Sequence, residues 1–330
     1  MKIPITVVTG FLGSGKTTLL SRILADSPNT AVLVNEFGEV GLDHHLLRRV
    51  NERTVLLGNG CVCCAMRDDL VESLVETLGE APRLDKVFIE TSGLADPAPI
   101  LYTVFSDPVL QHRFEVEAVV TTVDAVNGDL HLDRNPEAVK QLAASDVVVV
   151  TKADIAGAGK ARRLIHRLGS INPSANIVEA SFGEVEVSDL LRRGAVRVMS
   201  DPTDSHDASE TRSVSLTFDG PVDWAAFGAW LSMLLHARGE EILRVKGLLD
   251  VGESGPVVLD GVNHTIHPPR HLDEWPDEDR RTRVVFITKG VRAEEIMASL
   301  DAFARLLGAS PQPLLSGSES SSSQLMSRPG

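Results

Sequence analysis

A glycine-rich segment, residues 10–17, has the spacing Gly-x-x-x-x-Gly-Lys-Thr. Glycines let the backbone wrap closely around a phosphate chain, so that its N–H groups point at phosphate oxygens. Lys16 can then reach the outer phosphates, and the Thr17 hydroxyl can coordinate Mg²⁺. The segment lies between an apolar run and a helical pattern, the context in which this motif binds a nucleotide. The residues expected to bind the phosphates are Gly10, Gly13, Ser14, Gly15, Lys16, Thr17 and Thr18.

A second segment, Thr151 to Asp154, has residue types that recognise a guanine base. The Asp154 carboxylate can accept hydrogen bonds from two guanine N–H groups, and the stem of Lys152 can cover the ring. Adenine has no such donor pair, so GTP is favoured over ATP. Thr151 stands where asparagine is commoner, which predicts a weaker guanine preference. The alternative is a strand end with a capping aspartate.

Two further polar segments follow apolar runs. Glu90 and Gly93 place a carboxylate where it can hold Mg²⁺ or orient water, and a glycine near the terminal phosphate. Residues 35–39 could form a first switch segment, although an ordinary acidic loop is the alternative. The expected catalytic set is therefore Lys16, Thr17, Glu90 and Gly93.

All the cysteines of the chain, Cys61, Cys63 and Cys64, lie within four positions. An odd, crowded set is a poor disulfide framework and a good metal site. Thiolates near a helix N-terminus suit a soft or borderline divalent ion, with tetrahedral Zn²⁺ expected first. Three ligands leave one position open, which indicates a metal that enters and leaves, assisted by Glu36 or Glu39. A redox pair and inert packing are the alternatives.

The composition and charge of the chain indicate which partners are unfavourable and which compartment to expect. The net charge of -14 and the pI near 5.2 argue against nucleic acid or an anionic membrane as partner. The apolar run at the start is too short for a signal peptide, and no later run reaches membrane-spanning length. We therefore expect a cytoplasmic protein.

The elements that must position these residues follow an α/β pattern. Short β-branched runs alternate with helical patterns over the first two hundred residues, which predicts a P-loop NTPase domain with a mostly parallel sheet and helices on both faces. The expected strands are 3–9, 31–35, 86–90, 116–123 and 146–151, and the expected helices are 16–25, 66–78 and 157–168. The functional residues then lie at the carboxyl ends of the strands.

A polar, acidic stretch separates this part from the remainder of the chain and predicts a flexible linker. Beyond it we expect a smaller α+β domain, with strands 213–218, 242–249, 256–262 and 283–289 and helices 222–237 and 293–307. The serine-rich end predicts a disordered tail. The expected domains are therefore 1–199, a linker at 200–212, 213–308 and a tail at 309–330.

The motifs at 10–18, 35–38, 60–64, 90–93 and 151–154 resemble, in the same order, those of the CobW-type GTPases. Segment 242–247 and the pair Trp275-Pro276 resemble their C-terminal domain, so the resemblance covers about residues 3–308. It implies a GTPase that supplies Zn²⁺, or alternatively Co²⁺, to a client metalloprotein. We expect Mg²⁺ at the nucleotide and slow hydrolysis, because no arginine finger is evident near these motifs. Cobalt supply for cobalamin synthesis and nitrile hydratase activation are the alternatives within the family. A homodimer is a further expectation.

The resemblance assigns Lys16 and Thr17 to phosphate and magnesium, the three cysteines to the internal metal site, and Lys152 and Asp154 to the base. We expect nucleotide state and metal affinity to be coupled, because the cysteine segment lies between the two switch segments. Two competing classes remain open. One is a P-loop small-molecule kinase, and the other is a non-catalytic module braced by zinc.

Overall fold

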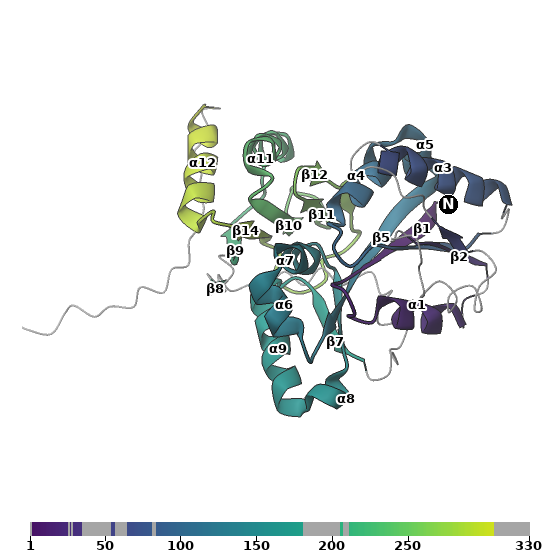
Figure 1. The fold of residues 1–330 in the computed structure, drawn as a ribbon. Helices are drawn as coiled ribbons and strands as arrows, with labels where there is room; N and C mark the ends of the chain where they lie inside the picture. Colours follow the sequence, from purple (N-terminus) through teal and green to yellow (C-terminus); the bar gives the residue numbers. More distant parts are fainter. Residues whose placement is uncertain are drawn as a thin grey trace, which may run out of the picture.

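The computed structural model describes residues 2–25, 27, 29–34, 54–56, 65–80, 84–180, 205–206 and 211–306. Within these ranges the chain forms two units, each built on its own β-sheet (Figure 1). Every helix in the described ranges is too short or too polar to cross a lipid bilayer.

The first unit contains a sheet whose described strands all pair in parallel. In spatial order they are β3 (Thr54–Leu56), β2 (Thr30–Val34), β4 (Lys86–Glu90), β1 (Ile3–Thr9), β5 (Phe114–Asp124), β6 (Val147–Thr151) and β7 (Asn176–Glu179). Successive valines of β6 enter different cores, because Val147 packs with α1 (Lys16–Ala25) and Val148 packs on the opposite face. Burial of both faces explains why this strand is a continuous apolar run.

Helices cover the two faces of this sheet, with α1 on one face (Figure 1). The other helices of this unit are α3 (Ala65–Glu80), α4 (Ala98–Ser106), α5 (Pro108–Arg113), α6 (Gly128–Arg134), α7 (Pro136–Ala143), α8 (Ala153–Ala156) and α9 (Ala158–Ile171). Local chemistry sets the start of α5, where Asp107 Oδ1 accepts from the N–H of Val109 at 2.9 Å and Pro108 supplies a preset φ angle.

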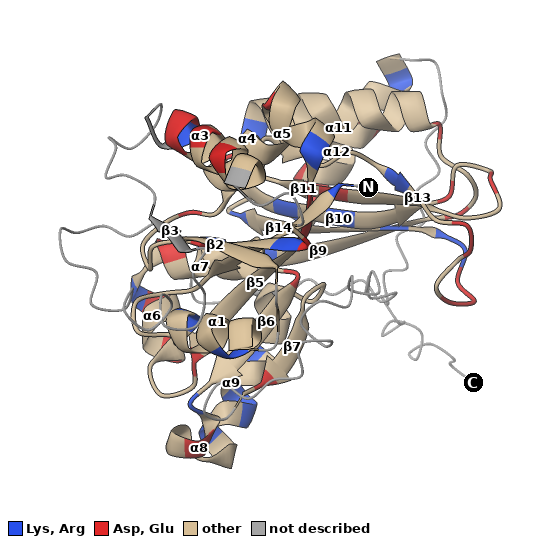
Figure 2. Ribbon diagram, turned by 90° about the vertical axis from the view of Figure 1, so that its right-hand side faces the viewer, with Lys and Arg blue, Asp and Glu red and all other residues tan. Residues whose placement is uncertain are grey.

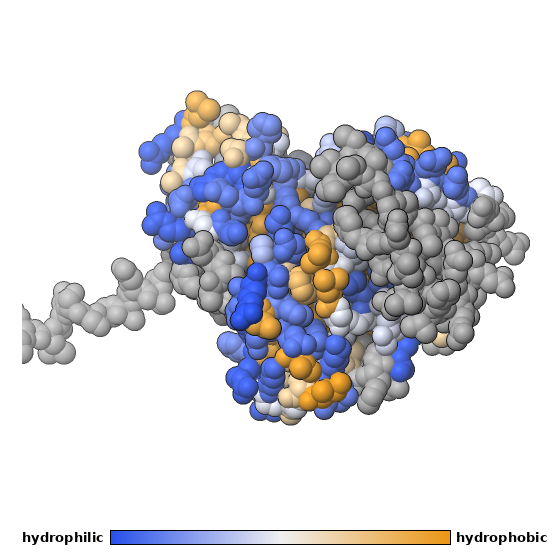
Figure 3. Space-filling view, viewed as in Figure 1, coloured by the Kyte–Doolittle hydropathy of each residue, from blue (hydrophilic) through white to orange (hydrophobic). Residues whose placement is uncertain are grey.

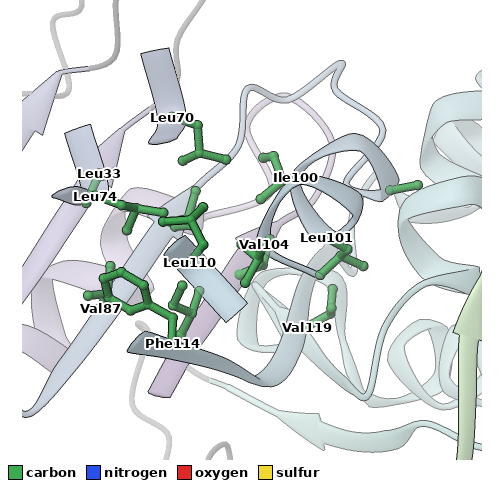
Figure 4. Packing of buried hydrophobic residues seen from close by; sticks show 14 of the residues in the cluster. Leu33, Leu70, Leu74, Val87, Ile100, Leu101, Val104, Leu110, Phe114 and Val119 are labelled. Atoms are coloured by element: carbon green, nitrogen blue, oxygen red, sulfur yellow. The ribbon is translucent and has the colours of Figure 1, made fainter. Parts of the chain in front are cut away.

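The main core of this unit lies between the sheet and helices α3, α4 and α5. Figure 4 shows Leu70 and Leu74 of α3, Leu101 of α4 and Leu110 of α5 gathered over the strand residue Val87. All five side chains are buried. This packing fixes the strand ends that carry the motifs, because close-packed side chains leave little room for the strands to shift.

The second unit is an antiparallel sheet covered by two helices. Its strands are β8 (Ser205–His206), β9 (Thr211–Phe218), β10 (Ile242–Leu249), β11 (Val257–Val262), β12 (Thr265–Ile266), β13 (Arg270–His271) and β14 (Thr282–Lys289), and its helices are α11 (Trp224–Arg238) and α12 (Ala293–Leu306). The rings of Phe227 and Trp230 of α11 pack edge to face, and the Trp230 ring packs in the same way against Phe286 of β14.

The two units pack directly against each other. Leu243 of β10 and Ile287 of β14 belong to the same buried cluster as residues of α7 and α9. Beside this cluster the fully buried Arg244 donates to the Ala144 carbonyl and to Asp146 Oδ1, the latter at 2.6 Å. The second unit is therefore joined to the end of α7 by apolar and ionic contacts.

Surface charge is distributed unevenly on the described residues. Figure 2 shows Asp and Glu on α3 and on the loops beside β13, as a net charge of -14 would lead one to expect. On the face drawn in Figure 3, the apolar side chains of the described part form small separate areas. Two apolar residues are exposed at the phosphate-binding segment: Leu12 within it, and Leu94 in the turn after β4.

The predicted fold class is confirmed, with a parallel P-loop-type sheet followed by a separate antiparallel α+β unit. Helices α4 to α8 were not among the expected elements. The structure also differs within the expected linker, because Ser205–His206 pairs with β9, and β9 begins at Thr211. These backbone hydrogen bonds add a strand where composition alone predicted a tether. The domain boundaries stay a prediction.

Candidate functional site

The glycine-rich segment forms the turn between β1 and α1, at the carboxyl edge of the sheet. Three of its glycines have positive φ angles, 137° at Gly10, 71° at Gly13 and 99° at Gly15. Side chains with a Cβ rarely adopt these angles. A Cβ on Gly10 would also lie 2.4 Å from the carbonyl oxygen of Thr122. The turn thus has the backbone shape that a phosphate-binding loop before a helix needs.

The first residues of α1 carry the side chains expected to meet phosphate and Mg²⁺. Lys16 Nζ donates to the carbonyl oxygens of Gly10 at 2.8 Å and Phe11 at 3.3 Å, so the ammonium lies within the turn. Thr17 Oγ1 donates to Glu90 Oε1 at 2.9 Å, and Glu90 is 4% exposed. Hydroxyl and carboxylate oxygens are hard ligands, so these residues fit Mg²⁺.

Thr151 connects the base segment to the phosphate turn. Its hydroxyl donates to the carbonyl oxygen of Ser14 at 2.7 Å, and the Ser14 hydroxyl shares a 2.6 Å hydrogen bond with Thr122. All three side chains are buried. A threonine at this position therefore ties the two nucleotide-binding segments together without an amide.

Lys152 makes a second connection of the same kind. Its backbone is left-handed, with φ 57°, and its ammonium donates to Gly13 O at 2.8 Å and Asp124 Oδ2 at 2.9 Å. Burial alone would raise the pKa of Asp124, but hydrogen bonds from Lys152, the Val126 N–H and Asn127 outweigh it and hold that pKa below its ordinary value. The carboxylate therefore stays ionised and fixes the lysine stem.

Two of the expected ligands lie at the surface of the site. Asp154 is exposed in the first turn of α8, two residues beyond Lys152, where a base could reach its carboxylate. Thr18 is exposed on the first turn of α1, immediately after Thr17. Both stay predicted ligands.

The turn after β4 lies directly against the phosphate turn. A Cβ on Gly93 would lie 2.6 Å from Leu12 Cδ2 and 2.8 Å from the Leu12 nitrogen, so only glycine fits there. The Gln141 amide of α7 donates to the carbonyl oxygens of Gly93 and Ala95. Neither Gln141 nor Asp124 was among the site residues expected from the sequence. Asp124 could have been found, because it ends a buried strand at the same sheet edge, but Gln141 has no such local signal.

The expected zinc ligands Cys61, Cys63, Cys64 and Glu36 lie outside the described residues, as does Glu39. Among the residues that are described, no three His, Cys, Asp or Glu side chains gather in a way that could hold a metal ion. The cysteine metal site therefore stays a prediction from the sequence.

Two family models match the chain. The nucleotide-binding domain of the CobW/HypB/UreG family matches residues 4–179, and the C-terminal domain of the cobalamin synthesis protein cobW matches residues 211–304. The two matches coincide with the two sheets of the structure.

Individual proteins are similar over most of the chain or over somewhat more than half of it. The zinc chaperone YjiA of Escherichia coli (strain K12) is 33% identical over 312 residues, 90% of this chain and 97% of that protein. Zinc-regulated GTPase metalloprotein activator 1 of Schizosaccharomyces pombe is 33% identical over 199 residues, 57% of this chain and 48% of that protein.

A solved structure agrees in fold. The crystal structure of Zn(II)-bound YjiA GTPase from E. coli has a TM-score of 0.70 at 28% identity, and the match covers 92% of this chain and 99% of that chain. The resemblance that the sequence motifs indicated is confirmed by these matches. The chain belongs to the CobW/HypB/UreG family of nucleotide-binding proteins.

Proposed function

We propose that this protein binds and hydrolyses GTP and uses the nucleotide to control delivery of a divalent metal ion, zinc first, to a client metalloprotein. One observation carries the nucleotide half: the phosphate turn is hydrogen-bonded to the base segment through Thr151 and Lys152, while Thr17 meets Glu90 at the same sheet edge. The metal half is supported by relatives described as a zinc chaperone and a GTPase metalloprotein activator.

The expected reaction is in-line attack of water on the terminal phosphate. The amides of residues 10–17 hold the phosphates, and the Lys16 ammonium neutralises their charge. Mg²⁺, when bound by Thr17 and Glu90, supplies Lewis-acid stabilisation. Gly93 brings its backbone beside the loop through its contact with Leu12. We expect slow turnover, since motifs 10–18, 90–93 and 151–154 contain no arginine.

Guanine selection would come from the base segment. The Lys152 stem is fixed by Gly13 and Asp124, and the exposed Asp154 carboxylate can accept from two N–H groups of one base. Adenine offers no equivalent pair of donors.

Coupling between nucleotide and metal is supported by strand register. Val34, the last residue of β2, pairs with both Glu90 of β4 and Leu56 of β3. Strands β2 and β3 therefore end at the edge where Glu90 accepts from Thr17, and the segments with the expected metal ligands follow these two strands in the sequence. A ligand set built from these segments would be sensitive to the nucleotide if it stayed close to these strand ends.

Replacing Cys63 with serine is expected to weaken zinc binding at least about tenfold, since a hydroxyl is a much poorer ligand for Zn²⁺ than a thiolate. Competition with a chromophoric zinc chelator measures the affinity, and phosphate release measures GTP turnover. Unchanged zinc affinity together with an unchanged turnover number in Cys63→Ser would remove the metal half of the proposal.

The same protein samples can distinguish this function from the two competing ones, a module braced by zinc and a small-molecule kinase. A zinc-braced module should melt when the metal is chelated, whereas a transfer site should keep its melting temperature. A small-molecule kinase would transfer the phosphate to a metabolite instead of water. Cobalt as the physiological metal would appear as an affinity for Co²⁺, and not for Zn²⁺, that changes when a non-hydrolysable GTP analogue binds. A cytoplasmic location, a homodimer, and the lack of nucleic-acid or membrane partners stay predictions.

A further inference from the structure

Gln141 is a buried polar residue in the last turn of α7, with 1% of its surface exposed. Its Nε2 donates to the carbonyl oxygen of Gly93 at 3.2 Å and to that of Ala95 at 3.0 Å. Both carbonyls belong to the turn that follows Glu90. One amide therefore holds the turn at two points, 48 and 46 residues away along the chain.

The helix that carries this amide is itself fixed to the sheet. Thr121 of β5 donates to the Gln141 carbonyl oxygen at 3.0 Å. Asn172, which follows α9, donates to the carbonyl oxygens of Leu142 at 2.9 Å and Ala143 at 3.2 Å. These hydrogen bonds connect the last turn of α7 to β5 and to the residue that follows α9.

The second unit holds the same helix from the other side. Leu243 packs with Val139 and Leu142 of α7, and Arg244 donates to the Ala144 carbonyl at the end of the helix. The amide of Gln141 thus lies on a helix that is in contact with both units.

The Gln141 amide lowers the folding stability locally, because burying a polar atom without a hydrogen bond costs free energy. Gln141 Oε1 is buried and has no hydrogen-bond partner among the described residues. A leucine of similar size would leave no such atom, but it would also supply no donor to the two carbonyls. Gln141 therefore provides a pair of N–H donors directed at the turn that contains Gly93 and Ala95.

We propose that Gln141 is a positioning residue for GTP turnover, which sets the Gly93 turn against Leu12 of the phosphate turn. This inference rests on the proposed GTPase function. The contact of Gly93 with Leu12 leaves no space for a Cβ, so a small displacement of the turn changes its distance from the phosphate-binding backbone. Terminal-phosphate chemistry depends on that distance, whereas GDP binding uses the phosphate turn and the base segment.

The test compares Gln141→Leu with the wild-type full-length protein. We expect the single-turnover rate of GTP hydrolysis to fall about tenfold, while the dissociation constant of fluorescent GDP changes less than about twofold. Gln141→Glu keeps the shape, but an ionised carboxylate donates no hydrogen bond and repels the two carbonyl oxygens, so its rate is expected to fall at least as far as that of Gln141→Leu. Gln111→Leu makes the same substitution at an exposed position of α5 and should leave both quantities unchanged.

Two results would overturn the proposed role of Gln141, and a third would overturn the proposed function. A Gln141→Leu rate within about twofold of the wild-type rate overturns the inference, because positioning must affect the chemical step. A parallel loss of GDP affinity and rate in both Gln141 variants also overturns it, since that is the result of general unfolding. If the wild-type protein does not hydrolyse GTP at all, the proposed function itself fails.

Discussion

Replacing Lys16 with alanine is expected to lower the turnover number for GTP by about 10²–10³-fold, the usual effect of removing one group that stabilises transition-state charge. The ammonium lies inside the phosphate turn, held by the carbonyl oxygens of Gly10 and Phe11, and 9% of the residue is exposed. The Lys16 ammonium is therefore placed within the turn that is expected to bind the phosphates. Phosphate release at saturating GTP and Mg²⁺ measures the effect.

Lys289→Ala is the matched control, because Lys289 is an exposed lysine at the end of β14 in the second unit. It should keep the wild-type turnover number. If Lys16→Ala retained wild-type turnover, the phosphate turn would not be the site of hydrolysis.

Replacing Arg244 with methionine is expected to lower the free energy of unfolding by about 3–5 kcal/mol, the range for removing one member of a buried ion pair. Arg244 is fully buried and donates to Asp146 at 2.6 Å and Asp260 at 3.0 Å. Lys246 would still pair with Asp146 at 2.9 Å, but Asp260 would lose its guanidinium. Urea unfolding followed by tryptophan fluorescence is the measurement, since all three tryptophans lie in the second unit.

The control for this prediction is Arg281→Met, which removes a 2.8 Å ion pair to Asp279 at a half-exposed arginine. Exposed pairs contribute about 0–1 kcal/mol, so a loss at Arg244 no larger than the loss at Arg281 would contradict the prediction.

The loss of unfolding free energy in Arg244→Met should also depend on pH. Burial raises the pKa values of Asp146 and Asp260, but Lys246, Arg244 and, for Asp260, His267 outweigh it and lower both.

The direction of the pH effect follows from these lowered pKa values. A carboxyl group whose pKa is lower in the folded protein stabilises it fully above the unfolded pKa of about 4, and this stabilisation is lost as the pH falls towards the folded pKa. The difference in stability between wild type and Arg244→Met should therefore shrink below about pH 4.

The elements that carry the motifs could be predicted because their signals are local. Helix 16–25 and strands 3–9 and 86–90 have the predicted bounds, since the glycine turn and the runs of β-branched residues mark where each begins and ends. The strand 146–151 was predicted within one residue of β6 for the same reason. The pairing of these strands in a parallel sheet follows from the helices between them.

The contacts that complete the site could not be predicted in this way. Thr151 reaches Ser14 across 137 residues, and Arg244 reaches Asp146 across 98. Such pairs depend on which strands become neighbours, and no local pattern near Gln141 or Arg244 indicates that order. In the polar stretch before β9, the sequence predicts a flexible linker, whereas the structure has a short strand. Ser205–His206 has the composition of a linker, and it forms this strand by pairing with residues 212–213.

In the proposed function, the nucleotide at the phosphate turn changes the affinity of the cysteine segment for zinc. The most direct measurement is the zinc dissociation constant of the wild-type protein saturated with a non-hydrolysable GTP analogue and Mg²⁺, compared with the same protein saturated with GDP and Mg²⁺. We predict that the two constants differ by about tenfold, a coupling free energy of about 1.4 kcal/mol. Equal zinc affinity in the two nucleotide states would contradict the claim.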